Sequence, residues 1–137
     1  MKIIETTPGE FLVVLSKGED LMDSLMQFSA EKKVISGFLL QGIGMLEDLE
    51  IGFFNGTTYE KETFQDAMEL ISLGGNLTTR EGAGNWHLHC AIAGPGGAVS
   101  GGHLFRARVA VTVELFFKAF QQEIFRHKAG ETLWLIA

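Results

Sequence analysis

The sequence predicts an α+β fold: a single compact domain built mostly of antiparallel β-sheet, with one main amphipathic helix. Three observations predict it. Only one stretch, close to residues 20–33, repeats its apolar residues at helical spacing. At least six other stretches have the pattern of strands, and short turn-forming sequences separate them. With 137 residues the chain has the length of one domain, so we expect residues 1–137 to fold together.

The helix is predicted from its two ends as well as from its periodicity. Glu19 and Asp20 open it, and Lys32 and Lys33 close it. Acidic residues at a helix start and basic residues at its end both interact favourably with the helix dipole. We therefore expect the helix to run from about residue 20 to about residue 33.

The strands follow from short β-branched or alternating segments bounded by glycine, asparagine or proline. The expected strands cover residues 11–15, 37–46, 49–54, 66–77, 86–93, 99–105, 109–117 and 132–136, with a short element near 123–127. Asn55-Gly56 and residues 94–97 are turn signals, and residues 78–85 have the composition of a mobile loop. Gly74 and Gly75 indicate a bulge, or a place where something lies close to the backbone. In residues 109–117 strict alternation places Val111 on the apolar face with its odd-numbered neighbours.

Composition excludes several classes of protein. The absence of any apolar run near 18 residues argues against a membrane span, and the start of the chain lacks the apolar stretch of a secretory signal. A single cysteine, Cys90, excludes an internal disulfide framework and suits a reducing, cytoplasmic location. The net charge of −6 counts against general affinity for the phosphate backbone of DNA, although it leaves room for a local basic patch.

Three of the four histidines, His87, His89 and His103, lie within 17 residues. Because side chains alternate along a strand, His87 and His89 share a face while Cys90 points to the opposite, apolar face. If Pro95–Gly97 form a three-residue loop, Gly94 pairs with Ala98 and His89 lies directly opposite His103. Facing Cβ atoms are then about 4.5–5.5 Å apart. The three imidazoles could converge on one ion, and a loop one residue longer or shorter would separate them.

Three histidines with an open fourth position are typical of catalytic zinc, and imidazoles also suit nickel or iron(II). The alternative is a satisfied polar cluster at a subunit interface. Glu114 interrupts an apolar strand. Its carboxylate could orient a ligating imidazole, act as an acid or base, or pair with Arg106 or Arg108. Arg106 and Arg108 share a strand face and could hold an anion, or form a solvated rim. Glu69 is a second candidate for proton transfer.

Several segments together resemble one protein family. They are His87–Ala93, Gly94–Val99, Ser100–Leu104, Val111–Leu115 and Met68–Asn76, with Glu10-Phe11 and Gln41–Gly44 also fitting. The pattern is similar to the plant and prokaryote conserved (PPC) domain, and it covers nearly the whole chain. Its most specific part is His-x-His followed by Gly-Gly-His-Leu. At residues 66–68 the chain has Asp, Ala and Met where the family's motif has Gly, Arg and Phe.

The resemblance implies a homotrimer and, for the bacterial branch, the label of a DNA-binding or regulatory protein. The AT-hook with which plant members contact DNA has no counterpart here. The resemblance also extends to acetolactate decarboxylase, which shares the general fold and whose zinc is held by a similar His-x-His and a distant His. It thus favours a metal at His87, His89 and His103. The functions left open are a regulatory trimer, a zinc-dependent lyase or hydrolase for a small oxygen-rich substrate, and a trimer with purely structural histidines.

Overall fold

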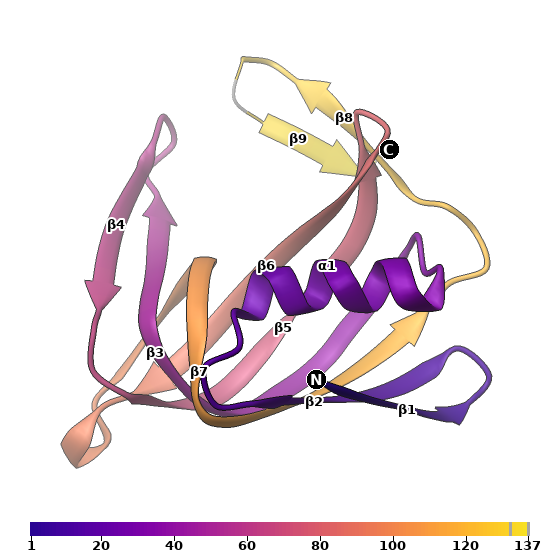
Figure 1. Ribbon diagram of the computed structural model, residues 1–137. Helices are drawn as coiled ribbons and strands as arrows, with labels where there is room; N and C mark the ends of the chain where they lie inside the picture. The colour runs from indigo at the N-terminus through magenta and orange to yellow at the C-terminus, as the bar shows by residue number, and fades with distance from the viewer. Residues whose placement is uncertain (132, 137) are drawn as a thin grey trace.

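Nine strands and one α-helix form the part of the chain that the structure, a computed structural model, describes: residues 1–131 and 133–136 (Figure 1). The elements are β1 (Lys2–Thr7), β2 (Glu10–Ser16), α1 (Leu21–Lys32), β3 (Gly37–Phe54), β4 (Tyr59–Phe64), β5 (Met68–Arg80), β6 (Ala83–Ala93), β7 (Val99–Ala119), β8 (Phe125–Ala129) and β9 (Leu133–Ile136). A 3₁₀ turn at Pro95–Gly97 links β6 to β7.

All the described strands belong to one sheet. Its order is β1-β2-β7-β3-β5-β8-β9, with β4 paired to β3, and β6 paired to both β5 and β7. Every pair is antiparallel except β5 and β8, which run parallel over only two residue pairs. The expectation of a compact, mostly antiparallel domain with one main helix is confirmed.

Helix α1 begins and ends where its sequence predicts. The Asp20 side chain accepts a hydrogen bond from the Asp23 N–H at 3.0 Å, which caps the first turn. Lys33 closes the helix in a left-handed conformation, with φ 54°. Leu21, Leu25 and Phe28 are buried on one face, and this face holds α1 against the sheet.

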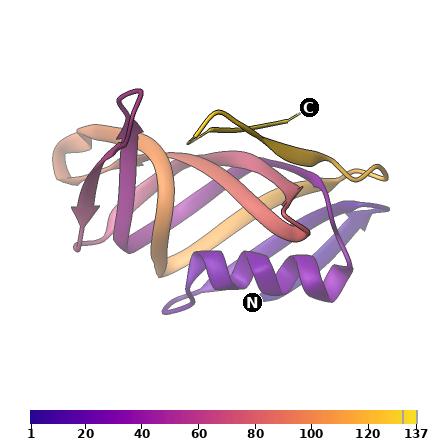
Figure 2. The ribbon, with the colours of Figure 1, turned by 90° about the horizontal axis from the view of Figure 1, so that it is seen from above.

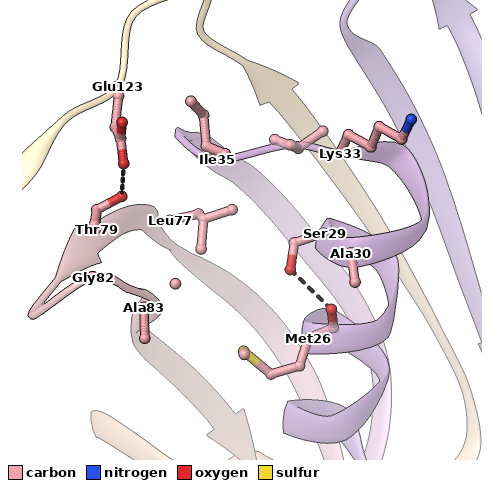
Figure 3. A pocket seen from close by; sticks show the side chains of 12 residues that line it. Met26, Ser29, Ala30, Lys33, Ile35, Leu77, Thr79, Gly82, Ala83 and Glu123 are labelled. Atoms are coloured by element: carbon pink, nitrogen blue, oxygen red, sulfur yellow. Dashed lines mark hydrogen bonds between the residues drawn. The ribbon is translucent and has the colours of Figure 1, made fainter.

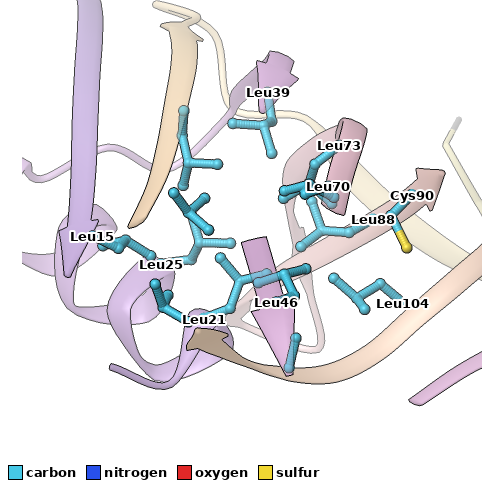
Figure 4. Packing of buried hydrophobic residues seen from close by; sticks show 14 of the residues in the cluster. Leu15, Leu21, Leu25, Leu39, Leu46, Leu70, Leu73, Leu88, Cys90 and Leu104 are labelled. Atoms are coloured by element: carbon cyan, nitrogen blue, oxygen red, sulfur yellow. The ribbon is translucent and has the colours of Figure 1, made fainter. Parts of the chain in front are cut away.

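The core lies between α1 and the concave side of the sheet (Figures 1 and 4). Phe28 sits between Phe11 and Phe117, edge-on to both, with ring centroids 5.3 Å away in each case. Trp86 packs on the same Phe117 at 5.4 Å. These contacts join the helix to β2, β6 and β7, so they fix the strand that begins the histidine hairpin.

Two predicted interruptions do not break their strands. Segments 37–46 and 49–54 form the single strand β3, and segments 99–105 and 109–117 form the single strand β7. The chain absorbs the irregular residues as bulges: Asp48 has φ 48°, and the register of β3 against β7 shifts on either side of it. A further shift between Gly44 and Leu46 turns Val111 outward, so it is 59% exposed and does not share the buried face of its odd-numbered neighbours, which strict alternation predicts.

The predicted mobile loop at 78–85 is also wrong. β5 continues to Arg80 and β6 starts at Ala83, so the connection is the two-residue turn Glu81-Gly82. Both turn residues have positive φ, 52° and 79°, as the tightest hairpin turns require. The glycine-rich segment therefore forms part of a β-hairpin rather than a mobile loop. The predicted last strand, 132–136, is found as β9 from Leu133, and residue 132 lies outside the described residues.

The two faces of the sheet carry different elements. Figure 2 shows α1 on one side of the sheet and the β8–β9 hairpin beyond the opposite side. Within the described residues, no helix has the length and apolar character needed to cross a membrane.

Candidate metal centre

The β6–β7 hairpin has the predicted register. His89 pairs directly with His103, and the Gly94 N–H donates to the Ala98 carbonyl at 3.1 Å to close the three-residue loop. On the other face of β6, Trp86, Leu88, Cys90 and Ile92 are all buried. Their burial in the core orients His87 and His89 toward the opposite side of the sheet.

The three imidazoles form a nearly equilateral triangle. Their ring centroids are 5.0, 5.1 and 5.3 Å apart, and the Nε2 atoms of His87 and His89 are 3.1 Å apart. One nitrogen from each ring lies within 4.8 Å of the other two. His103 Nδ1 is buried and has no hydrogen-bond partner among the described residues. Three converging nitrogens and an orphaned buried nitrogen fit an imidazole-bound metal.

Burial favours the uncharged form of two of these rings, His87 and His103. Burial, followed by the neighbouring His87, His89 and Lys61, lowers the pKa of His103 to about 4. Burial also lowers the pKa of His87, and Arg126 and His89 add to the effect. A neutral imidazole keeps a lone pair for a metal, so both shifts favour ligation.

Cys90 is excluded as a fourth ligand, as its place in the alternation predicts. It lies among core leucines (Figure 4), and burial raises the pKa of its thiol to about 11. His127, the fourth histidine, is exposed on β8, as expected.

A cleft of about 430 Å³ opens beside the triad. His87 and His103 line it together with aromatic side chains and two arginines. Besides the two histidines, the lining residues are Phe54, Tyr59, Arg80, Asn85, Trp86, Phe105, Arg126, Leu133, Trp134 and Leu135. The Tyr59 and Phe105 rings lie 5.1 and 4.6 Å from the His103 ring. These aromatic contacts fix the orientation of His103 in place of a hydrogen bond.

Arg126 is the site residue that sequence reasoning missed. Its Nη2 lies 3.0 Å from His87 Nδ1 and donates to Asn76 Oδ1 at 3.0 Å. Burial and then the charge of Arg80 lower the pKa of its guanidinium. Only the parallel pairing of β8 with β5 brings Arg126 to β6, and no local pattern signals such a distant contact.

Glu114 and Arg106 lie outside this cleft. Glu114 is exposed on β7, opposite Val14 and Ile43. Arg106 donates to the Asp48 carbonyl at 3.1 Å and lies 4.0 Å from Glu50, so its ion-pair partner is Glu50 and not Glu114. Arg108 and Glu69 are also exposed and do not line the cleft.

The glycines before His103 serve close strand packing. A Cβ on Gly102 would lie 2.7 Å from the Gly52 carbonyl oxygen, and one on Gly101 would lie 2.7 Å from that of Cys90. A Cβ on Gly75, which lies on β5 beside β6, would be closer still, 2.0 Å from the His87 carbonyl oxygen. The predicted close approach to the backbone is therefore found at Gly75, whereas a Cβ on Gly74 would make only an ordinary contact, 3.7 Å from the Leu39 carbonyl oxygen.

A second cavity, of about 380 Å³, lies at the C-terminal end of α1 (Figure 3). Mainly apolar and small residues line it, and its acid, Glu123, is already bonded to the Thr79 hydroxyl. It holds no group of potential metal ligands; among the described residues, such a group is found at His87, His89 and His103.

Known structures share this whole architecture. A plant- and prokaryote-conserved (PPC) protein from Pyrococcus horikoshii is 25% identical, with a TM-score of 0.85 over 99% of this chain and 93% of that one. A metal-containing protein from Archaeoglobus fulgidus is 28% identical, with a TM-score of 0.82 over 98% and 99% of the two chains. A candidate DNA-binding protein from Bacteroides thetaiotaomicron is 23% identical, with a TM-score of 0.91 over 99% and 96%, which shows the fold alone.

Among characterised sequences, the bifunctional protein GlmU of Synechococcus sp. (strain JA-3-3Ab) is 31% identical over 90 residues. That match covers 66% of this chain but spans only 14% of the length of that relative. A family model covers far more: the Plants and Prokaryotes Conserved (PCC) domain matches residues 5–121, including all three histidines and the strands that position them. The chain therefore belongs to the Plants and Prokaryotes Conserved (PCC) domain family.

Proposed function

We propose that this protein binds one divalent transition metal ion, zinc by preference, through His87, His89 and His103, and acts as a lyase or hydrolase on a small oxygen-rich molecule. The observation that carries the proposal is the convergence of three imidazoles, with one nitrogen of each within 4.8 Å of the others and one ring with an orphaned buried nitrogen. The name of the Archaeoglobus fulgidus protein, metal-containing, adds support.

A metal ion held there supplies Lewis-acid chemistry. The protein's own groups shape the site around it. The core-facing side of β6 fixes the direction of His87 and His89, and Tyr59 and Phe105 pack on His103. The aromatic side chains of the cleft offer a bound molecule an apolar surface beside the histidines.

Metal analysis of protein purified without a histidine tag tests this proposal. We expect about one zinc or other divalent transition metal ion per chain, and a large loss of metal in H87A and H89A. The control is H127A, which removes the exposed histidine on β8 and should leave the metal content unchanged. A content far below one ion per chain that H87A and H89A do not alter would exclude the metal site.

The roles of Glu114 as an acid or base and of Arg106 as an anion holder require a second copy of the chain. Within one chain neither side chain lines the cleft. A structure of the assembled protein tests both roles. A Glu114 carboxylate that faces solvent in the assembly would remove its catalytic role.

The assembly that we propose is a homotrimer. Large apolar side chains are exposed on adjacent strands of the face away from the core: Phe38, Leu40 and Ile43 on β3, Ile71 on β5 and Val111 on β7. Exposed patches of this kind mark interfaces. Light scattering should give about three times the 15.0 kDa chain mass. I43D should dissociate the assembly, whereas V99D, at the far end of β7, should not; a monomeric wild type would exclude the trimer.

DNA is the second candidate partner, because solved relatives from Bacteroides thetaiotaomicron and Ralstonia eutropha JMP134 are named as candidate DNA-binding proteins. The net charge of −6 opposes nonspecific binding. A gel-shift assay at physiological salt tests this partner. Failure to bind duplex DNA at micromolar protein would exclude it.

A further inference from the structure

We propose that the histidine cleft contains a binding site for an oxyanion, a carboxylate or phosphate-type group, formed by Arg126 and the Nδ1 side of His87. This inference deepens the proposed function, on which it rests, by naming the chemical class of the molecule that the cleft takes. Arg126 lies on β8, outside residues 5–121, so the family pattern does not include it.

Arg126 is a part-buried cation whose partners are all neutral. Its Nε donates to Thr78 Oγ1 at 3.1 Å and its Nη1 to the Trp134 carbonyl at 3.0 Å. Its Nη2 reaches Asn76 Oδ1 and His87 Nδ1, each at 3.0 Å. Among the ion pairs of the described residues, none includes Arg126. The guanidinium is thus held rigidly without a counter-charge.

Among the described residues, the lining of the cleft adds a second positive charge and contains no acid. Arg80 also lines the cleft; its nearest acid is Glu81, at 3.9 Å, and its guanidinium stacks 4.1 Å from the Trp134 ring. No Asp or Glu is among the described residues that line the cleft. A cleft lined by two guanidiniums and aromatic side chains favours an anion with an apolar or compact body.

If His87 binds a metal through Nε2, its other nitrogen, Nδ1, needs a hydrogen-bond acceptor. His87 directs Nε2 toward His89, at 3.1 Å, which is the side from which the triad would hold a metal. A neutral imidazole that gives its Nε2 lone pair to a metal carries its proton on Nδ1. In ligating histidines this second nitrogen usually donates to a carboxylate, a carbonyl or water.

In this chain His87 Nδ1 faces Arg126, which carries only donors. With metal bound, two N–H groups would point at each other across 3.0 Å, and the contact would have to open. An oxyanion between them accepts from both the Arg126 Nη2–H and the His87 Nδ1–H. It supplies the acceptor that the histidine lacks and the counter-charge that the arginine lacks. Metal and anion should therefore strengthen each other's binding.

The experiment is a titration of the full-length protein with benzoate and with phenylphosphonate, in chelator-treated and in Zn²⁺-loaded forms. The two probes distinguish a carboxylate site from a phosphate-type site, and neutral benzamide is the control ligand. Calorimetry gives the affinity, and the side-chain Nε–H resonance of Arg126, assigned by its loss in R126K, reports binding directly. We expect saturable binding of one anion, a shift of that resonance, and tighter binding to the Zn²⁺-loaded form.

Two matched variants distinguish the contribution of Arg126 to anion binding from that of the overall positive charge of the β8–β9 hairpin. R126Q should weaken anion binding by on the order of tenfold or more, as expected for a charge-assisted hydrogen bond. K128Q removes the same charge from an exposed position of β8 and should bind as the wild type does. Metal content should persist in both variants.

The outcomes separate this inference from the proposal beneath it. Protein that takes up metal but leaves the Arg126 resonance unmoved by both anions overturns the anion site alone. Protein that binds the anions but holds no metal defeats the proposed function and leaves the Arg126 site standing.

Discussion

Acid should destabilise the metal-free protein through His103. Its pKa is lowered from an ordinary value of 6.5 to about 4, chiefly by burial. The folded state thus holds His103 neutral where the unfolded chain would protonate it. For a base whose pKa is lowered by folding, the stabilisation is complete above pH 6.5 and is lost as the pH falls toward 4.

The size of the effect follows from the two pKa values. Between pH 7.5 and pH 4.5, a shift of this size corresponds to about 2.5 kcal/mol of unfolding free energy. Water reaches part of the His103 ring and screens its charge. We therefore expect a loss of about 1 kcal/mol of unfolding free energy between these two pH values. The groups that face His103 are His87, His89 and Lys61, and the charge of each opposes its protonation.

Urea unfolding of chelator-treated protein at the two pH values measures this contribution. H103N removes the titrating ring and keeps a polar side chain of similar reach. The variant should lose about 1 kcal/mol less stability on acidification than the wild type. H127N, at the exposed histidine, should behave as the wild type does. Equal acid sensitivity in wild type and H103N would refute the reasoning.

Three further predictions concern the fold that holds the site. F28A should cost about 3–5 kcal/mol in urea unfolding, because it empties a fully buried position between two aromatic rings; a loss below 1 kcal/mol would contradict the packing. D20A should cost about 1 kcal/mol by removing the cap of α1, whereas D20N should cost little. G75A should cost about 1–3 kcal/mol or more and also reduce metal uptake, since its Cβ would meet the His87 carbonyl; full metal content with wild-type stability would exclude this role.

Much of the fold follows from local sequence patterns. The helix ends were predictable because Asp20 and Lys33 cap it with their own backbone and side-chain chemistry. The register of the triad was predictable because a three-residue loop fixes which residues face each other across a hairpin. Family resemblance and spacing thus agreed on the same three histidines.

The sequence predictions that failed depend on contacts between residues that are far apart in the chain. Strands β3 and β7 continue through irregular residues because each pairs with several neighbours, and a bulge costs less than a break in that pairing. The glycines at 82 and 84 suggested mobility, but pairing along all of β5 and β6 imposes a tight turn between them. Arg126 could not be found locally, because its place depends on a contact between strands 46 residues apart.

The hairpin that carries Arg126 is joined to the rest of the sheet by only two residue pairs. It can therefore change sequence, or be exchanged, with little disturbance to the strands that support the imidazoles. A chain with the same three histidines and a different C-terminal segment would keep the triad but lose the side of the cleft that Arg126 and Trp134 form.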